Sequence, residues 1–181
     1  VAMRYGMAPE TVARILASQH TISPHRMALS TVNREGTSFT LIDDSFNANP
    51  DSMKAGLNGL KAWNSNDGKE PFRVALLGAM LELGADETAL HTSIGTYADE
   101  LGIDAIIAVG SAQDQHLDAL AQALADGARQ SQSASVDCVH DIDAAEQLVI
   151  DLARNHPDAV VLLKGSHASG LSALAERWAK N

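Results

Sequence analysis

The feature that most constrains the fold is a regular alternation of short apolar runs with longer segments of helical periodicity, from about residue 50 to the C-terminus. Short apolar runs bounded by turn residues are typical of buried strands, which we expect at 73–77, 105–109, 136–139 and 159–163. Strands separated by helices of this length predict right-handed βαβ crossovers. The expected fold class is therefore α/β, a Rossmann-like, doubly wound and mostly parallel sheet with helices on both faces.

The segments between these runs carry helix signals. Helices are predicted at 50–63, 86–101, 112–125, 141–155 and 171–179. Gly102 stands at a C-cap position of the second. Upstream, two extended stretches at 28–32 and 37–43 flank a turn at 33–36 and predict an N-terminal β-hairpin. A short amphipathic helix at 7–18 and a linker at 20–24 are expected before it.

Composition excludes several classes of protein. The net charge of −10 argues against binding to a phosphate backbone, which needs a basic surface. Cys138 is the only cysteine, so no internal disulfide and no multi-cysteine metal site can form. No apolar run approaches the roughly 20 residues of a membrane span. The N-terminus lacks an initiator Met and does not resemble a signal peptide, so we expect the chain to begin in mid-protein.

Ligands of parallel sheets gather at the carboxyl ends of the strands, so the segments that follow strands are the candidates for chemistry. The richest is residues 43–52, which closes a strand and opens a helix. Free N–H groups at a helix start can bind an anion, and the amides of Asn47 and Asn49 suit an adenine edge or a peptide backbone. The same residue types also cap ordinary helices, which is the structural alternative.

A second candidate is the run Lys164-Gly165-Ser166-His167 after the last apolar strand. Glycine allows close approach to the backbone, Lys supplies a positive charge and Ser a hydroxyl, so together they could hold a carboxylate. The alternative is a solvated strand end with a flexible glycine.

A third candidate is residues 78–84 with His91 downstream. Glu82 and His91 could contact a nucleotide, or could belong to loop and helix surface, and a lone histidine is more often structural. The remaining histidines lack metal-ligand spacing, and His116 and His140 are expected at the surface.

Three common motifs are absent from the sequence. It has no G-x-x-x-x-G-K-[ST] phosphate loop, so the chain does not cradle a triphosphate in the usual way. The absence of G-x-G-x-x-G and of G-x-S-x-G weakens dinucleotide-binding and hydrolase interpretations.

Taken in order, these segments resemble the C-terminal domain of the Mur ligases, the ATP-dependent ligases of peptidoglycan synthesis. Residues 43–53, D-D-S-F-N-A-N-P-D-S-M, are similar to the D-D-S-Y-N-A-N-P-D-S-M signature of the members that add D-alanyl-D-alanine. Residues 78–84 and His91 resemble L-G-D-M-x-E-L-G and its downstream His. Residues 162–166 resemble V-K-G-S-R, and residues 24–27 resemble the P-G-R-M junction before the C-terminal domain.

The resemblance implies one domain of a three-domain, cytoplasmic bacterial ligase that joins D-alanyl-D-alanine to UDP-muramoyl-tripeptide with ATP and Mg²⁺. Residues 1–24 would be the tail of the central ATP-binding domain and a linker, and residues 25–181 the C-terminal domain. The central domain would hold the ATP phosphates and Mg²⁺. The present chain would carry no catalytic residue and no metal ligand, would be inactive alone, and would bind neither nucleic acid nor membrane.

The resemblance also implies residue roles. Nucleotide contacts would come from Arg26, Asn47, Asn49 and Glu82, and substrate contacts from Asn49, Lys164, Gly165, Ser166 and His167. The chain departs from the family pattern at several positions, with His25 for Gly, Phe46 for Tyr, Ala79 for Asp, His167 for Arg and Leu171-Ser172 for Met-Glu. Two alternatives therefore stay open: a diverged paralogue with another amine substrate, and a non-catalytic nucleotide- or metabolite-binding module. A purely structural domain with well-capped loops would leave the ordered matches as coincidence.

Overall fold

The computed structural model describes residues 25–64, 70–130 and 134–180, so the helix expected at 7–18 and the linker at 20–24 lie outside the described residues. One six-stranded sheet runs through the molecule in the order β1-β2-β6-β3-β4-β5. The strands are β1 (Ala28–Arg34), β2 (Thr37–Asp44), β3 (Arg73–Gly78), β4 (Ala105–Val109), β5 (Ser135–Val139) and β6 (Val160–Lys164). Each of the six strands predicted from the sequence is present, within two residues of its expected bounds.

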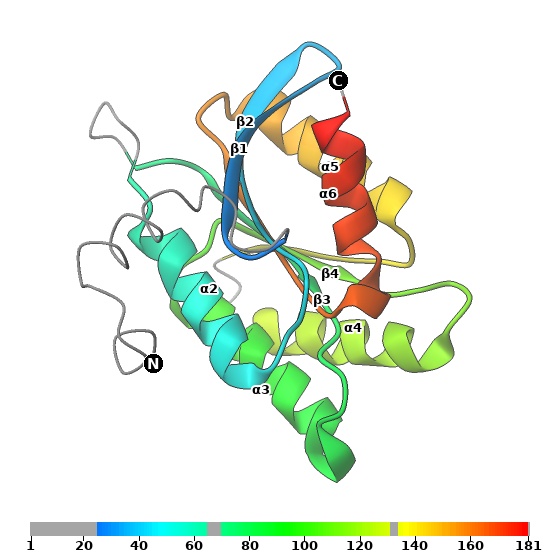
Figure 1. Cartoon of the computed structure of the whole chain (residues 1–181). Coiled ribbons are helices and arrows are strands. Elements are labelled where there is room, and N and C mark those ends of the chain that lie inside the picture. The colour runs from blue at the N-terminus through cyan, green and yellow to red at the C-terminus, as the bar shows by residue number, and fades with distance from the viewer. Residues whose placement is uncertain (1–24, 65–69, 131–133, 181) are drawn as a thin grey trace, which may run out of the picture.

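Helices cover both faces of the sheet (Figure 1). One face carries α2 (Pro50–Ala62), α3 (Glu87–Glu100) and α4 (Gln115–Ala128), and the other α5 (Ile142–Asn155) and α6 (Leu171–Ala179). Two short 3₁₀ helices, η2 (Gly84–Asp86) and η3 (His167–Ser169), precede α3 and α6. The predicted doubly wound α/β fold is confirmed. Within the described ranges, no helix is long and apolar enough to cross a membrane.

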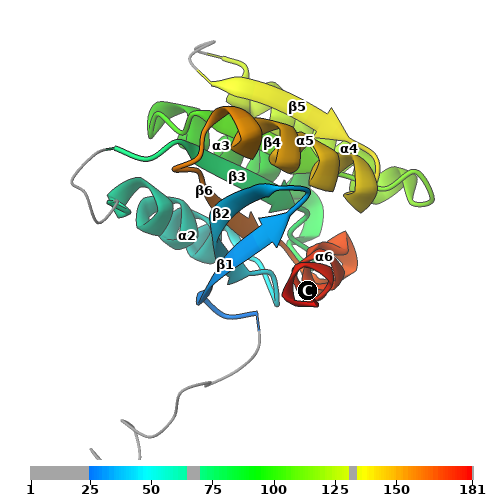
Figure 2. The same cartoon turned by 90° about the horizontal axis from the view of Figure 1, so that it is seen from above.

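The predicted hairpin forms one edge of the sheet. β1 pairs antiparallel with β2, from Ala28 opposite Asp43 to Arg34 opposite Thr37, whereas the other strand pairs are parallel. Glu35 and Gly36 adopt φ values of 47° and 78°, the left-handed geometry of a tight hairpin turn. Figure 2 shows β1 and β5 at opposite edges of the sheet.

The strand order places a switch point beside β6. The chain passes from β2 through α2 to β3 and continues outward to β5, and β6 then inserts between β2 and β3. β2 and β3 lead into helices on one face, and β6 leads into α6 on the other. Because connections diverge to opposite faces there, the carboxyl ends of β2, β6 and β3 surround the crevice where doubly wound sheets bind ligands.

The core is built from alternate residues of the central strands. Every residue of β3, β4 and β6 is buried, as expected for strands with helices on both faces. Ala75 and Leu77 pack toward α2, α3 and α4, whereas Val74 and Leu76 pack toward α5 and α6.

α3 and α4 touch through their backbones. A β-carbon at Gly95 would overlap the carbonyl group of Leu124, and one at Gly127 would overlap the carbonyl group of Thr92. Thr96 adds a hydroxyl hydrogen bond across the crossing, to the Gly127 carbonyl at 3.3 Å. The two glycines therefore set the distance between the helices.

The position of α4 corrects the sequence analysis. The helix was expected at 112–125, but it begins at Gln115 and ends at Ala128. The Asp114 carboxylate accepts hydrogen bonds from the N–H groups of His116 at 2.9 Å and Leu117 at 3.2 Å. An N-cap side chain at 114 satisfies the free N–H groups of the first turn, so the helix starts after it. Apolar periodicity alone did not reveal this boundary.

Candidate functional site

A polar cavity of about 170 Å³ lies at the carboxyl ends of β2 and β6, at the switch point. Its lining comes from the segment before β1, the β2–α2 connection, the first turn of α2 and the last residue of β6. The lining residues are Arg26, Asp44, Phe46, Asn47, Asn49, Ser52 and Lys164. Four residues proposed from the sequence thus meet at one cavity: Arg26, Asn47, Asn49 and Lys164.

The two asparagines hold the connection between β2 and α2 through their side-chain oxygens. Asn49 is the N-cap of α2: its Oδ1 accepts from the Ser52 N–H at 2.8 Å, and the Ser52 hydroxyl accepts from the Asn49 N–H at 3.0 Å. The Oδ1 of Asn47 accepts from the Ala48 N–H at 2.8 Å. Both side chains line the cavity, and in this arrangement both keep their NH₂ groups as donors. The capping interpretation is correct, and it leaves donors for a ligand.

Lys164 is not a free cation. Its side chain is only 2% exposed, and its Nζ lies 2.9 Å from the Asp44 carboxylate and donates to the Asn47 carbonyl at 2.7 Å. The ammonium therefore ties the end of β6 to the β2–α2 connection, and Asp44 neutralises its charge. The sequence predicts an ammonium available to a carboxylate, whereas in the structure the ammonium already has partners.

Of the residues after Lys164, Gly165 and Ser166 are buried and His167 is exposed. A β-carbon at Gly165 would lie 2.7 Å from the Ser169 hydroxyl and 3.0 Å from the Gly78 α-carbon, so this glycine permits close packing of the loops after β3 and β6. Ser166 is 5% exposed, and within the described ranges its Oγ has no hydrogen-bond partner. His167 is exposed in η3.

Glu82 and His91 do not reach the cavity. Glu82 is exposed, with a φ of 62° in the loop after β3. His91 is fully buried: its Nε2 accepts from the Met80 N–H at 2.9 Å, and its Nδ1 donates to the Glu87 carbonyl at 2.7 Å. Burial lowers the pKa of His91, against an opposing effect of the Glu87 carbonyl, so the ring stays neutral. It holds the loop after β3, and it is neither a ligand contact nor a surface residue.

An aromatic contact that was not predicted from the sequence also lies at the cavity. The Phe46 side chain is 43% exposed at the cavity, and the Arg26 guanidinium lies 4.4 Å from the centre of its ring. A cation above an aromatic face at this distance is attracted by the ring quadrupole. Phe46 lies inside the segment singled out from the sequence, so the available signal was a large apolar side chain within a polar connection.

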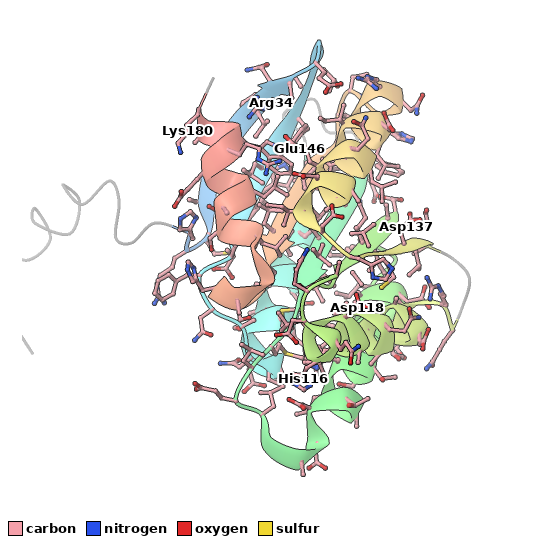
Figure 3. All side chains as sticks on the ribbon, turned by 90° about the vertical axis from the view of Figure 1, so that its right-hand side faces the viewer. Arg34, His116, Asp118, Asp137, Glu146 and Lys180 are labelled. Carbon is pink, nitrogen blue, oxygen red and sulfur yellow. The ribbon has the colours of Figure 1, made fainter. Side chains whose placement is uncertain are left out.

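Ionisable side chains also lie outside this cavity. Among the described residues, no group of three or more His, Cys, Asp or Glu side chains could hold a metal ion. Burial raises the pKa of the Cys138 thiol, which disfavours its thiolate. As predicted, the side chains of His116 and His140 are exposed, and they pair with Glu87 and Asp118. Figure 3 shows His116 and Asp118 among these surface side chains.

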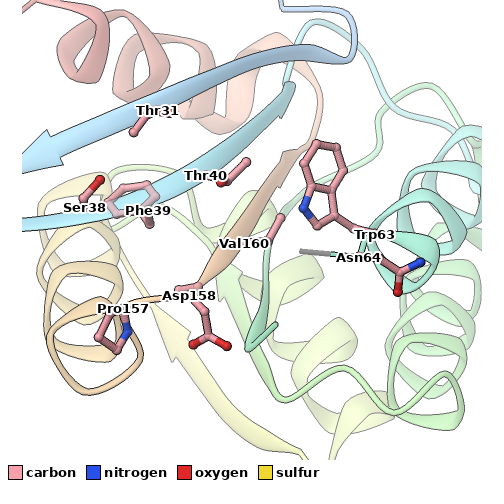
Figure 4. Close-up of a pocket in the computed structure, with 10 residues that line it drawn as sticks. Thr31, Ser38, Phe39, Thr40, Trp63, Asn64, Pro157, Asp158 and Val160 are labelled. Carbon is pink, nitrogen blue, oxygen red and sulfur yellow. The ribbon is translucent and has the colours of Figure 1, made fainter. Parts of the chain in front are cut away.

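A second cavity, of about 230 Å³, lies at the opposite end of the sheet (Figure 4). Its walls come from the starts of β2 and β6 and the end of α2, and include Phe39, Trp63, Asp158 and Val160. No cationic side chain lines it. Because doubly wound sheets bind ligands at the carboxyl ends of their strands, the smaller cavity at the switch point is the candidate site.

Comparison with known proteins identifies the family of the chain. The family profile described as "Mur ligase, glutamate ligase domain" matches residues 25–167. The chain is 37% identical over 182 residues to the UDP-N-acetylmuramoyl-tripeptide–D-alanyl-D-alanine ligase of Mycobacterium tuberculosis (strain CDC 1551 / Oshkosh), covering 97% of this chain and 35% of that protein. It is 36% identical to the Mycobacterium leprae enzyme of the same name, covering 97% of this chain and 34% of that protein.

Solved structures share the fold. MurF from Acinetobacter baumannii superposes with a TM-score of 0.74 at 24% identity, covering 99% of this chain and 35% of that one. MurF from Thermotoga maritima in complex with ADP superposes with a TM-score of 0.59 at 21% identity, covering 94% of this chain and 36% of that one. The chain belongs to the Mur ligase family. Its curated relatives over nearly the whole chain are D-alanyl-D-alanine-adding ligases, and it spans about a third of their length.

Proposed function

We propose that this chain is the C-terminal domain, and the closing lid, of an ATP-dependent ligase that joins D-alanyl-D-alanine to UDP-N-acetylmuramoyl-tripeptide in the bacterial cytoplasm. Residues 25–181 form this domain, and residues 1–24 belong to the central domain and a linker. The names of the curated relatives supply the substrates. The cavity at the switch point supports a role for the domain in binding.

The observation that carries the proposal is the convergence of Asn47 and Asn49 with Phe46 and Arg26 around one cavity. Amide groups can donate to and accept from the edge of a purine, and an aromatic ring and a guanidinium both offer flat faces for stacking. These groups are suited to the adenosine end of ATP. The alternative partner of the amides is the peptide backbone of the incoming dipeptide.

The same residues do not suit a triphosphate. Lys164 is already paired with Asp44, and the Arg26 guanidinium lies over the Phe46 ring, so the lining offers no cluster of cations for three phosphates. The sequence has no phosphate loop. ATP phosphates and Mg²⁺ therefore belong to another part of the ligase, and this domain contributes contacts to adenosine.

Substrate contacts belong to the segment after β6. Among the described residues the Ser166 Oγ has no hydrogen-bond partner, but it is buried, so a dipeptide carboxylate would reach it only after the surrounding loops move apart. Lys164 acts by holding the β2–α2 connection, and Gly165 by letting two loops pack. The exposed Glu82 and His167 contact ligand only when the other domains close against this one.

The proposed reaction explains why such a lid is needed. ATP phosphorylates the tripeptide carboxylate, the amine of D-alanyl-D-alanine attacks the acyl phosphate, an amide bond forms, and ADP and phosphate leave. An acyl phosphate hydrolyses when water reaches it, so a domain that orients the amine and excludes water raises the yield of amide. The domain supplies orientation and closure and requires no nucleophile or general base of its own.

The test uses the full-length ligase with Asn47→Ala, Asn49→Asp and, as a matched control, Asn33→Ala. Asn49→Asp keeps a side-chain oxygen for the α2 cap and removes the NH₂ donor. Asn33 is an exposed asparagine of β1 near the hairpin turn. We expect kcat/KM for ligation to fall by about tenfold or more for both site variants, the loss of one or two hydrogen bonds, and to stay unchanged in the control.

Wild-type turnover by both site variants would remove the site assignment. The second candidate, a stand-alone binding module, is tested by titrating the 181-residue chain with ATP and with D-alanyl-D-alanine. Tight, saturable binding without the other domains favours the module. If the full-length protein ligates a different amine and does not accept D-alanyl-D-alanine, the diverged paralogue is favoured.

A further inference from the structure

The segment just before β1 makes contacts that the proposed function does not use. His25 Nδ1 lies 2.7 Å from Asp43 Oδ2, and the His25 carbonyl accepts a hydrogen bond from the Phe46 N–H at 3.2 Å. The Met27 N–H donates to Asp44 Oδ1 at 3.3 Å. These contacts join residues 25–27, the junction segment, to the end of β2 and to residues 45–49, the site loop.

The backbone of the junction segment adopts an unfavourable conformation. His25 and Met27 have φ values of 59° and 48°, in the left-handed region that residues with a β-carbon seldom occupy. Such a conformation persists where surrounding contacts hold it. Glycine adopts this geometry freely but carries no side chain. In this chain an imidazole occupies the position and makes a contact that glycine cannot make.

The Asp43 carboxylate links the imidazole to the site loop. Its Oδ2 faces His25, while its Oδ1 accepts from the Ser45 N–H at 3.2 Å and the Ser45 hydroxyl at 2.6 Å. Asp43 is only 7% exposed, so these hydrogen bonds are largely shielded from water. Ser172 of α6 donates to the Ser45 carbonyl at 2.7 Å and fixes the other side of the loop.

We propose that His25 is a positioning residue that fixes the site loop relative to the junction segment through the Asp43 carboxylate. The inference rests on the proposed function in one respect, that the loop carries the adenosine contacts Asn47 and Asn49. A second acid, Glu176 of α6, lies 3.7 Å from His25 Nε2, but its side chain is 60% exposed. An exposed contact of this length contributes little. The contact with Asp43 therefore carries the effect.

The chemistry of the contact suggests matched variants. His25→Gly permits the same backbone geometry without strain and removes the imidazole, while it adds backbone freedom at this position. The His25→Asn variant separates these two effects because it keeps a side chain. His25→Asn places an amide nitrogen on Cγ, where Nδ1 stands in histidine, and asparagine tolerates the left-handed region. The asparagine should restore what the glycine loses. Glu176→Gln removes the charge of the second acid and serves as a control.

The experiment measures amide hydrogen exchange across residues 45–49 in the full-length ligase, with the KM for ATP measured on the same proteins. We expect His25→Gly to speed exchange in this loop roughly tenfold, the effect of losing one hydrogen bond to a carboxylate. His25→Asn and Glu176→Gln should stay within about twofold of wild type. Because fewer molecules then hold a binding-competent loop, the KM for ATP should rise at least about twofold in His25→Gly, with kcat unchanged.

Unchanged loop exchange in His25→Gly would overturn the proposal, and so would equally faster exchange in α4, which indicates general destabilisation. Failure of His25→Asn to restore slow exchange would also overturn it. Faster exchange in His25→Gly with an unchanged KM for ATP would instead show that the loop does not carry the adenosine contacts, which contradicts the proposed function and not the role of His25. Failure of the proposed function is a separate result: a wild-type enzyme that does not ligate D-alanyl-D-alanine. In that case the exchange of residues 45–49 still decides whether His25 holds the loop.

Discussion

The α3–α4 crossing and the site loop are held together in opposite ways. At the crossing, Gly95 and Gly127 bring two backbones into contact, and most of the order comes from buried apolar side chains such as Ile94 and Leu124. In the site loop, Phe46, Asn47 and Asn49 are exposed, and order comes from side-chain hydrogen bonds to the backbone. The first region depends on volume and the second on particular polar atoms.

This difference indicates that the α3–α4 crossing contributes mainly to stability and the site loop mainly to binding. A packed backbone crossing has no space for an added atom, so small changes of volume there should cost much stability. A loop held by individual hydrogen bonds should lose little stability when one is removed, while the ligand contacts change. Substitutions in the two regions should therefore differ in their effects on stability and on ligation.

The largest effect is expected at the α3–α4 crossing. Gly95→Ala would push a methyl group into the Leu124 carbonyl, so the helices must separate. We expect a loss of about 3 kcal/mol or more in the free energy of unfolding, or no folded protein at all. Denaturant unfolding of the full-length ligase, followed by a probe in this domain, measures the change.

Gly59→Ala in α2 is the matched control. An added β-carbon there would lie 3.5 Å from the Met27 side chain, an ordinary contact. Because alanine favours helix over glycine, this variant should be neutral or gain up to about 1 kcal/mol. Equal losses in the two variants would show that the crossing is no more tightly packed than α2, which would break the comparison.

A smaller loss of stability is expected at Lys164, which is buried and also makes an ion pair. Lys164→Met removes the cation and leaves the Asp44 carboxylate, 18% exposed, without its partner. We expect a loss of about 2–3 kcal/mol, less than for a fully buried pair because Asp44 retains some access to water. Adding Asp44→Asn should recover part of that loss. If the double variant is less stable than Lys164→Met, the ion pair is not the cause.

Much of the fold followed from sequence, because burial on both faces of a parallel sheet leaves runs such as residues 105–109 without a polar residue. The start of α4 did not follow, because Asp114 and Ala112 are both compatible with the periodicity and only the cap contact distinguishes them. In the site, the residue types around Asn47 and Asn49 indicated the cavity. The pairing of Lys164 with Asp44 is a long-range contact, which no local pattern specifies.

His91, a buried residue of α3, allows the packed region around the α3–α4 crossing to be tested by changing the pH. Burial lowers its pKa in the folded state, so the unfolded chain binds a proton more readily as the pH falls. Stability from the neutral ring is therefore present above the ordinary histidine pKa, near 6.5, and is lost as the pH falls below it. We expect His91→Gln to cost about 1 kcal/mol at pH 7 and to flatten the fall in Tm between pH 7 and pH 5. Parallel Tm profiles for wild type and variant would contradict a buried neutral imidazole.

The smallest effect is expected at the α2 cap, where stability and binding can be separated in one residue. Asn49→Ala removes the oxygen that accepts from the Ser52 N–H and should cost about 1 kcal/mol. Asn49→Asp keeps that oxygen and adds a negative charge at a helix N-terminus, so its stability should lie within a few tenths of a kcal/mol of wild type. Both variants lack the NH₂ donor at the cavity, so kcat/KM for ligation should fall by about tenfold or more in both. Thermal unfolding and ligation measured on the same preparations test the pair. Full ligation by the stable Asn49→Asp variant would mean that Asn49 serves only as a cap, and that the binding role of the site loop depends on Asn47 and Phe46.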